Sequence, residues 1–374
     1  MRKIRVLVVD DAAAVRRVVS DALASDPEIE VAGVAPTGRL ALAKLPQLNP
    51  DLVTLDVEMP GMSGLETLAE IRTYYPDLPV IMVSAHTEQG AVVTLEALSL
   101  GASDYLAKPA GLPSAEDVQA YLREHLLPKV KALCASRLGR PASLLVARPA
   151  PPEAEPREVR LRAERIDVVG IGVSTGGPNA LAVILSGLAA DFPVPILVVQ
   201  HMPPVFTRLL AERLCDSTPL RVREAVPGGQ LEPGVVWLAR GDHHMVVEKQ
   251  GKRTNVGINQ EPRENSCRPS VDVLFRSLAA TFGARSLAAV LTGMGRDGLR
   301  GCQEVRDAGG QVLAQDEATS VVWGMPGFVA NAGLAQAVLP LNGIAAEIER
   351  KAWVRRSRGL AATSANRKGV SSGE

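Results

Sequence analysis

The chain has 374 residues, of which 46% are hydrophobic, enough to fill the cores of two or more domains. Its 41 basic side chains balance 41 acidic ones, so no net field recruits nucleic acid or an anionic membrane. No stretch reaches about 18 uninterrupted apolar residues, and the first apolar run is too short for a signal peptide core, so we expect a soluble cytoplasmic protein without direct membrane insertion.

The first 109 residues alternate between strand and helix patterns. Continuous apolar runs of the kind found in buried parallel strands occupy residues 4–9, 30–34, 52–55, 79–83 and 104–107. Helical periodicity fills the intervals between them. We therefore expect a doubly wound α/β domain, in which the carboxyl ends of the parallel strands border one crevice where ligands bind.

Polar residues stand at the carboxyl ends of four of these strands: Asp10, Asp11, Asp56, Ser84 and Lys108. Three carboxylates near one point repel one another unless a cation lies between them, and hard oxygen ligands suit Mg²⁺. Ser84 and Lys108 would complete a site for a phosphoryl group on Asp56. The alternative is that polar residues simply begin loops, which is common at any single position but improbable at all five.

These residues lie in motifs that resemble the receiver domain of response regulators. The matching segments are Leu-Asp-Val-Glu-Met-Pro-Gly-Met-Ser-Gly around Asp56, Val-Ser-Ala around Ser84 and Tyr-Leu-Ala-Lys-Pro around Lys108. The resemblance implies a flavodoxin-like fold and phosphotransfer from a histidine-kinase partner to Asp56, with Mg²⁺ held by Asp10, Asp11 and Asp56. It also implies that Lys108 contacts the phosphoryl group, that Ser84 moves to hydrogen-bond it, and that Tyr105 is a coupled aromatic switch. Because such domains often have a cis bond after this lysine, we expect one at Lys108–Pro109.

A last helix of this domain is predicted to begin at Ser114, with Asp117 as its capping-box partner, and Pro128 should kink or end it. The domain is therefore expected over residues 1–134. Residues 135–164 are rich in Pro, Ala and Arg and predict a semi-extended linker. Its arginines could instead form a docking motif, but a solvated spacer is favoured.

The second domain begins with an apolar strand that runs into a glycine-bracketed serine and then into a helical pattern, over residues 166–188. The letters Gly-Val-Ser-Thr-Gly place Ser174 at a sharp strand-to-helix turn beside free backbone N–H groups, as for a nucleophile. The same glycines fit a loose phosphate-binding loop. This stretch alone does not decide between a hydrolase and a nucleotide binder.

Two later strands of this domain also end at residues with acid–base chemistry. The strand at 195–199 runs into His201, and the strand at 286–291 is followed by a glycine-rich loop that contains Asp297. Further elements are expected as strands 220–224 and 311–314, a helix 299–307, and an antiparallel hairpin formed by 235–239 and 245–248. The hairpin turn would carry Asp242, His243 and His244, but a metal site there is disfavoured because adjacent turn residues seldom converge on one ion.

Ser174, His201 and Asp297 together give a triad hypothesis. A serine is a poor nucleophile until a histidine takes its proton, and the histidine needs a carboxylate to fix its tautomer and stabilise the imidazolium. Taken alone, His201 could equally be a structural loop residue. The chain order Ser, His, Asp differs from the Ser, Asp, His order of α/β-hydrolases, which counts against that fold.

Residues 166–348 resemble the catalytic domain of chemotaxis-type protein-glutamate methylesterases. The matching motifs are Gly-Val-Ser-Thr-Gly-Gly-Pro, Gln-His-Met-Pro, Arg-Pro-Ser-Val-Asp, Leu-Thr-Gly-Met-Gly-Arg-Asp-Gly and Gly-Met-Pro. The resemblance implies a Rossmann-like parallel sheet with a hairpin and cofactor-free hydrolysis of glutamate methyl esters on chemoreceptor cytoplasmic helices in chemotaxis adaptation. It also implies deamidation of receptor glutamines. Backbone N–H groups near Thr175 and Met294 are the candidates for the oxyanion hole. The chain departs from the family at Val173, where alanine is usual, and at Cys267, where histidine often stands.

We expect this catalytic domain over residues 165–352, a disordered tail over 353–374, and a monomer whose unphosphorylated receiver covers the Ser174 crevice. Arg268 could orient the substrate or form a structural salt bridge. The four cysteines lack zinc-knuckle or disulfide spacing, so each is predicted to be a small buried residue. A phosphorylation-switched binding protein with an incidental serine is the second hypothesis. Nucleotide binding ranks third, because its acidic ribose partner would be Asp191, which follows a helix rather than a strand.

Overall fold

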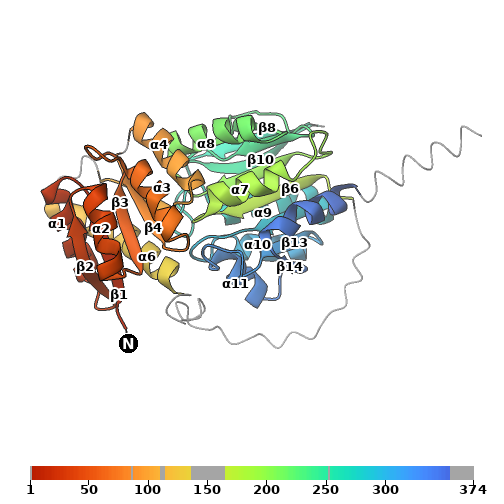
Figure 1. The fold of residues 1–374 in the computed structure, drawn as a ribbon. Helices are drawn as coiled ribbons and strands as arrows, with labels where there is room; N and C mark the ends of the chain where they lie inside the picture. Colours follow the sequence, from red (N-terminus) through yellow and green to blue (C-terminus); the bar gives the residue numbers. More distant parts are fainter. Residues whose placement is uncertain (1, 86, 110–113, 136–164, 252, 354–374) are drawn as a thin grey trace, which may run out of the picture. The chain divides into compact units, whose positions relative to one another are not determined.

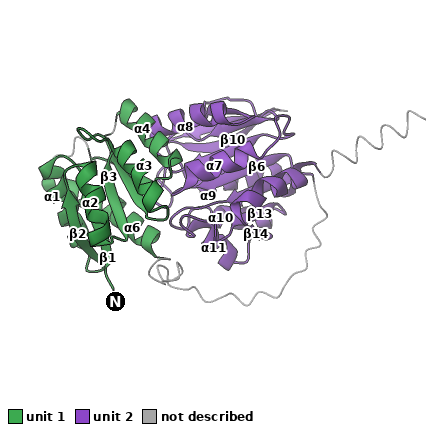
Figure 2. Cartoon of the chain, in the orientation of Figure 1, with its two compact units in different colours: residues 1–148 green, residues 149–374 purple. Residues whose placement is uncertain are grey.

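The computed structural model describes residues 2–85, 87–109, 114–135, 165–251 and 253–353. The chain divides into two compact units, residues 1–148 and 149–374 (Figure 2). The predicted linker and tail therefore lie almost wholly outside the described residues. None of the described helices is both long and apolar enough to cross a membrane.

The first unit contains a five-stranded sheet in the order β2-β1-β3-β4-β5, with every neighbouring pair parallel (Figure 1). This is the flavodoxin-like order, so the predicted fold is confirmed. The central strands are buried along almost their whole length, as their uninterrupted apolar runs require. The strands are β1 Ile4–Val9, β2 Ile29–Ala35, β3 Leu52–Asp56, β4 Val80–Ser84 and β5 Asp104–Ala107.

Helices connect these strands, and four of them, α2 to α5, begin at a Ser or Thr N-cap whose side chain accepts from a backbone N–H group. α3 begins with a full capping box, in which Ser63 and Glu66 satisfy each other's backbone N–H groups. At α5 the Asp117 N–H donates to Ser114 Oγ at 3.1 Å, and the helix ends at His125 because Pro128 opens a separate helix, α6. The helices are α1 Ala13–Ala24, α2 Gly38–Leu48, α3 Gly64–Tyr74, α4 Glu88–Ser99, α5 Ala115–His125 and α6 Leu127–Cys134.

The second unit is built on a seven-stranded parallel sheet in the order β14-β13-β12-β6-β7-β9-β8. β6, the strand that leads to Ser174, lies at the centre between β12 and β7 and is completely buried. The predicted α/β class is confirmed. The strands are β6 Val168–Val173, β7 Ile196–Gln200, β8 Arg221–Glu224, β9 Val235–Leu238, β12 Ser286–Val290, β13 Gln311–Gln315 and β14 Ala337–Leu339.

The antiparallel hairpin exists, but its predicted strands are wrong. β9 belongs to the parallel sheet, and the hairpin pairs β10, His244–Gln250, with β11, Arg253–Asn259. The polar residues of β11 hid its strand pattern, and the place of β9 beside β7 is a long-range pairing that local sequence does not reveal. The turn around Gly241 passes so close to Pro203 that a side chain at Gly241 would meet its backbone.

One helix of the second unit lies directly on the sheet beneath the candidate site. α9 packs on β6, where a Cβ atom at Gly172 would overlap Val271 and one at Gly170 would meet Leu278. These glycines therefore allow close helix packing, and the phosphate-loop alternative loses its support. α9 was missed in the sequence analysis, although Val271, Leu274, Phe275 and Leu278 have helical spacing. The helices are α7 Gly177–Ser186, α8 Pro204–Ser217, α9 Val271–Phe282, α10 Leu299–Asp307 and α11 Met325–Asn331.

Candidate active site

Ser174 lies at a tight turn between β6 and α7. Its N–H donates to the Thr292 carbonyl at 3.0 Å, and its own carbonyl accepts from Gly177 N at 2.8 Å. Gly176 forms the N-cap of α7 with φ of 78°, a left-handed conformation that favours glycine. The G-x-S-x-G motif thus builds the strand-to-helix turn predicted for it, with a half-buried serine at its apex.

His201 stands beyond the carboxyl end of the neighbouring strand. Val173 and Gln200 are paired in the sheet, so Ser174 and His201 occupy equivalent positions just past β6 and β7. His201 Nε2 lies 2.8 Å from Asp297 Oδ2, and the two side chains are 15% and 3% exposed. The predicted pairing of histidine with carboxylate is present.

A dense set of hydrogen bonds holds the Asp297 carboxylate. Oδ1 accepts from Asn265 Nδ2 and Ser270 Oγ, each at 2.8 Å, and Oδ2 accepts from Val271 N at 2.7 Å. Burial alone would raise the pKa of Asp297, but His201 and these donors lower it to about 2. The carboxylate is therefore ionised at neutral pH. Asn265 and Ser270 were not predicted as site residues, although Ser270 belongs to the Arg-Pro-Ser-Val-Asp motif.

The second ring nitrogen of His201 faces Cys267, with 3.8 Å between Nδ1 and Sγ. Among the described residues no hydrogen bond joins the Ser174 hydroxyl to His201. Since Asp297 occupies Nε2, only Nδ1 can accept the serine proton. Burial lowers the pKa of His201, but the Cys267 sulfur and the Asp297 carboxylate favour the imidazolium and hold the pKa above its usual value.

The two oxyanion-hole candidates, Met294 and Thr175, differ in the hydrogen bonds of their backbone groups. Met294 lies between Gly293 and Gly295 in the loop after β12, and within the described part of the chain its N–H donates no hydrogen bond. Gly293 holds that loop in place, because its N–H donates to Val322 O and its carbonyl accepts from Met325 N. Thr175 is buried, and its carbonyl accepts from Thr292 Oγ1 at 2.9 Å. The Met294 N–H is thus available to a ligand oxygen.

Arg268 is held in a structural network. Its Nη2 lies 2.8 Å from Asp242 Oδ1, and its Nη1 donates to the Gln260 carbonyl at 3.0 Å. The salt-bridge alternative for Arg268 therefore fits the geometry.

His244, on the turn considered for a metal site, has protein partners at both ring nitrogens. Its Nδ1 accepts from Ser270 N at 3.2 Å, and its Nε2 lies 3.1 Å from the Pro262 carbonyl. The disfavoured metal site at this turn has no geometric support.

In the first unit, the predicted acidic cluster is assembled at the carboxyl ends of β1 and β3. Carboxylate oxygens of Asp10, Asp11 and Asp56 lie within 4.8 Å of one another. Lys108 Nζ lies 2.8 Å from Asp56 Oδ2 and 3.0 Å from Asp10 Oδ2. Despite that ion pair, the buried Asp10 Oδ2 has no well-aligned hydrogen bond. Burial chiefly raises the pKa of Asp56, to about 6, against the opposing effect of Lys108. Crowded carboxylate oxygens are ligands that fit a hard cation.

Ser84 and Tyr105 lie on the adjoining strands β4 and β5. Ser84 is completely buried and its hydroxyl donates to the Gly90 carbonyl at 3.0 Å. Tyr105 is buried on β5, with Lys129 Nζ 5.4 Å from the centre of its ring.

The predicted cis peptide bond at Lys108–Pro109 is wrong, since the cis peptide bond that the structure shows is Arg268–Pro269. Trans is favoured by only about 0.5–1 kcal/mol before proline, so tertiary context decides the isomer.

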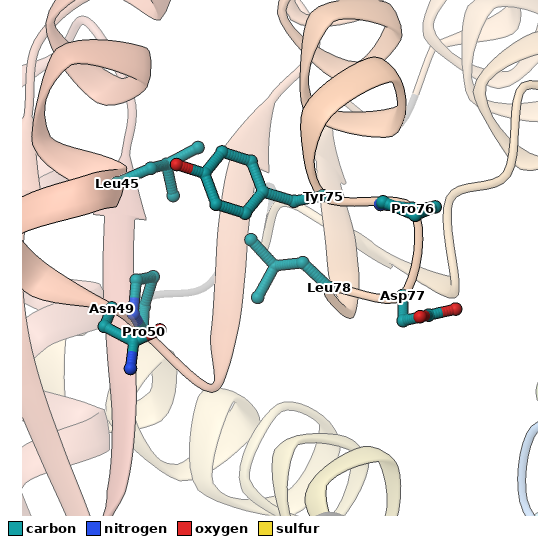
Figure 3. A pocket seen from close by; sticks show the side chains of 7 residues that line it. All are labelled: Leu45, Asn49, Pro50, Tyr75, Pro76, Asp77 and Leu78. Atoms are coloured by element: carbon teal, nitrogen blue, oxygen red, sulfur yellow. The ribbon is translucent and has the colours of Figure 1, made fainter.

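A small pocket of the first unit lies away from this cluster. Its volume is about 150 Å³, and Figure 3 shows Leu45 and Tyr75 lining it beside the chain that enters β3 and β4. This is the amino end of those strands, whereas the acidic cluster stands at their carboxyl ends. The pocket does not belong to the phosphoryl site.

Comparison with known proteins accounts for both units. The family described as CheB methylesterase matches residues 169–348, and the response regulator receiver domain matches residues 6–118. A protein-glutamate methylesterase/protein-glutamine glutaminase of Trichodesmium erythraeum is 50% identical over 352 residues, covering 94% of this chain and 99% of that protein. The chain belongs to this methylesterase family.

Other relatives also match this chain over nearly their full length. A relative of the same name from Nocardioides sp. is 50% identical over 94% of this chain and 96% of its own length. One from Caulobacter vibrioides is 47% identical over 93% of this chain and 99% of its own. The resemblance drawn from the sequence motifs is thus confirmed for the receiver and for the methylesterase domain.

The cysteine prediction holds for two of four residues. Cys134 and Cys302 are buried, but Cys215 is exposed on α8 and Cys267 is only partly buried beside His201. The prediction is wrong for these two because helical periodicity and loop position, rather than residue type, set their exposure. Cys267 is also the position where this chain departs from the histidine often present in the family.

Proposed function

We propose that this protein is a phosphorylation-activated hydrolase that removes methyl esters from glutamates on the cytoplasmic helices of chemoreceptors and also deamidates receptor glutamines. The observation that carries the proposal is the His201–Asp297 pair at 2.8 Å beside the strand-to-helix turn of Ser174. Relatives over nearly the full length bear names that state both activities.

In the proposed mechanism, Ser174 Oγ attacks the ester carbonyl carbon while His201 Nδ1 takes the hydroxyl proton. Asp297 keeps the proton on Nε2 and stabilises the imidazolium. The imidazolium then gives its proton to the departing methoxide, and methanol leaves the acyl-enzyme. Water attacks the acyl carbon while His201 Nδ1 takes a proton from it, and that proton passes to Ser174 Oγ as the acyl bond breaks, which restores glutamate and free Ser174. Because catalytic hydrogen bonds often tighten only in the substrate complex, the Ser174–His201 link is expected to form there.

The developing negative charge on the carbonyl oxygen needs hydrogen-bond donors. The Met294 N–H donates no hydrogen bond among the described residues and lies on a loop held by Gly293, so it is the first candidate, with Thr175 as the second. A single donor of this kind is worth about 10²–10³ in rate. An amide passes through a tetrahedral intermediate of the same kind, which makes glutamine deamidation chemically consistent with the same site.

Activation is proposed to begin at Asp56. A histidine kinase would transfer a phosphoryl group to its carboxylate, with Mg²⁺ held by Asp10, Asp11 and Asp56 to offset the charge of the entering group. Lys108 would pair with the phosphoryl oxygens, while Ser84 and Tyr105 would change position in response. A phosphoryl group adds about −1.5 to −2 charges, enough to reorder a loop. The unphosphorylated receiver would restrict access to Ser174 in a monomeric cytoplasmic protein.

Methanol release from methylated receptor membranes tests the esterase directly. Ser174→Ala is expected to lower the rate by about 10⁴–10⁶-fold, because the nucleophile is lost. Ser186→Ala is the matched control, since Ser186 is an exposed serine at the end of α7 and should leave the rate unchanged. Equal rates for Ser174→Ala and wild type would favour the alternative, a phosphorylation-switched binding protein.

A further inference from the structure

We propose that Cys267 Sγ and His201 Nδ1 form a binding site for a soft divalent metal ion, typically Zn²⁺, which reversibly inhibits the enzyme. The metal would occupy the ring nitrogen that must accept the Ser174 proton. The inhibition rests on the proposed function, whereas the binding itself depends only on the side chains.

The spacing of the two donor atoms suits a tetrahedral ion. Sγ and Nδ1 lie 3.8 Å apart. With Zn–S of about 2.3 Å and Zn–N of about 2.0–2.1 Å, a tetrahedral angle separates the two ligand atoms by about 3.5 Å. A shift of a few tenths of an ångström therefore brings both atoms into coordination, with no change of backbone.

The other side of the imidazole is already arranged as in metal sites. A histidine that binds a metal usually donates its second ring N–H to a carboxylate, which fixes the tautomer and raises the basicity of the ligating nitrogen. His201 Nε2 lies 2.8 Å from Asp297 Oδ2, and Asn265 and Ser270 hold that carboxylate from the other oxygen. His201 is thus prepared to present Nδ1 as a ligand.

The thiol is also held in place by its backbone. Glu264 N donates to Cys267 O at 3.1 Å and Cys267 N donates to Glu264 O at 2.9 Å, closing a four-residue turn. Asn265 and Ser266 within this turn have φ of 52° and 62°, and Asn265 is anchored on Asp297. The turn therefore links the position of the sulfur to the position of the His201–Asp297 pair.

The donor set separates this site from the acidic cluster of the receiver. Thiolate and imidazole favour zinc and other transition metals, whereas the three carboxylates favour Mg²⁺. Asp297 is saturated by its hydrogen bonds and would remain an outer partner. Two protein ligands leave further coordination positions for water, so the ion should bind reversibly, unlike a closed structural zinc.

Cobalt titration of the full-length chain, without a histidine tag and with excess Mg²⁺ on the acidic cluster, tests the binding. A thiolate-to-Co²⁺ absorption band is expected for wild type and for Ser174→Ala, which separates metal binding from esterase activity. Cys215→Ser, the matched control at the exposed cysteine, should keep the band, and Cys267→Ser should lose it. Cys267→His should bind Co²⁺ without the thiolate band, which shows that the turn still folds.

Zn²⁺ is expected to inhibit methanol release by wild type and by Cys215→Ser, with full recovery after chelation. Cys267→Ser should need about 10–100-fold more Zn²⁺ for the same fractional inhibition. Absence of the band in wild type, its survival in Cys267→Ser, or its loss in Cys215→Ser would overturn the site. If the band behaves as expected but Ser174→Ala retains wild-type methanol release, the metal site stands and the proposed esterase function fails.

Discussion

The Asp297 carboxylate accepts hydrogen bonds from three separate segments of the chain, through His201, Asn265 and the residues at the start of α9. These donors stabilise its charge although the side chain is only 3% exposed. A buried charge with this many partners orients the imidazole in the same pose in every molecule. Asn265 and Ser270 therefore position the Asp297 carboxylate.

Asp297→Asn is expected to lower kcat by about 10⁴-fold, because the amide cannot hold the proton on His201 Nε2. The measurement is methanol release at saturating substrate. Asp307→Asn serves as the control, since Asp307 is an exposed aspartate at the end of α10. A loss below tenfold for Asp297→Asn would contradict the assigned role of the carboxylate.

The raised pKa of His201 predicts the pH dependence of the reaction. The imidazole must be neutral to accept the serine proton, so kcat/KM should rise with pH and reach half its maximum above 6.5, the usual value for histidine. Cys267→Ser should move this midpoint to lower pH, because the sulfur that favours the imidazolium is gone. A pH–rate profile of both proteins checks this, and identical midpoints would exclude a Cys267 influence on His201.

At the scale of elements, the strand-to-helix unit of β6 and α7 depends on glycines for two different reasons. Gly176 provides the left-handed N-cap after Ser174, whereas Gly170 and Gly172 leave room for α9 against the sheet. The start of α9 in turn supplies N–H groups to Asp297. Packing of one helix on one strand thus couples the serine turn to the Asp297 carboxylate.

Gly172→Ala is expected to destabilise the second unit by about 1–3 kcal/mol, because the added methyl group would overlap Val271. Urea unfolding followed by circular dichroism measures the change. Gly343→Ala is the control, since it lies in a helix where a Cβ would make only ordinary contacts, and it should be neutral or stabilising by up to about 1 kcal/mol. Equal stability of Gly172→Ala and wild type would show that α9 can move away without cost.

At the scale of the whole molecule, two chemistries are divided between two units. Crowded carboxylates and Lys108 form the candidate site for a hard cation and a phosphoryl group in the first unit. A serine turn and a histidine–carboxylate pair form the candidate site for ester hydrolysis in the second. The proposed control by phosphorylation gives a reason for both sites to occur in one chain.

A small-molecule phosphodonor with Mg²⁺ is expected to raise the rate of methanol release by the wild type, and chelation of Mg²⁺ should remove the increase. Asp56→Asn should abolish the response without lowering the basal rate, because the acceptor carboxylate is absent. Asp77→Asn, on a loop at the opposite end of the sheet, is the control and should respond like wild type. Equal stimulation of Asp56→Asn and wild type would remove Asp56 from the regulation.

Much of this protein is determined by its sequence alone. Apolar runs predicted most of the described parallel strands, because a strand buried on both faces must be apolar throughout, and the residues just past strand ends predicted both candidate sites. Local signals in the sequence also predicted the helix break at Pro128 and the strand-to-helix turn at Ser174.

Only the tertiary structure decided what depends on contacts between distant residues. The pairing of β9 with β7, the packing role of Gly172, and the donors around Asp297 have no local signature. Cys267 lies 66 residues from His201 in sequence, and only the fold brings the thiol to the ring nitrogen. Strand pairing and helix packing set such distances. Both are long-range interactions, so the residue types and their spacing along the chain do not specify them.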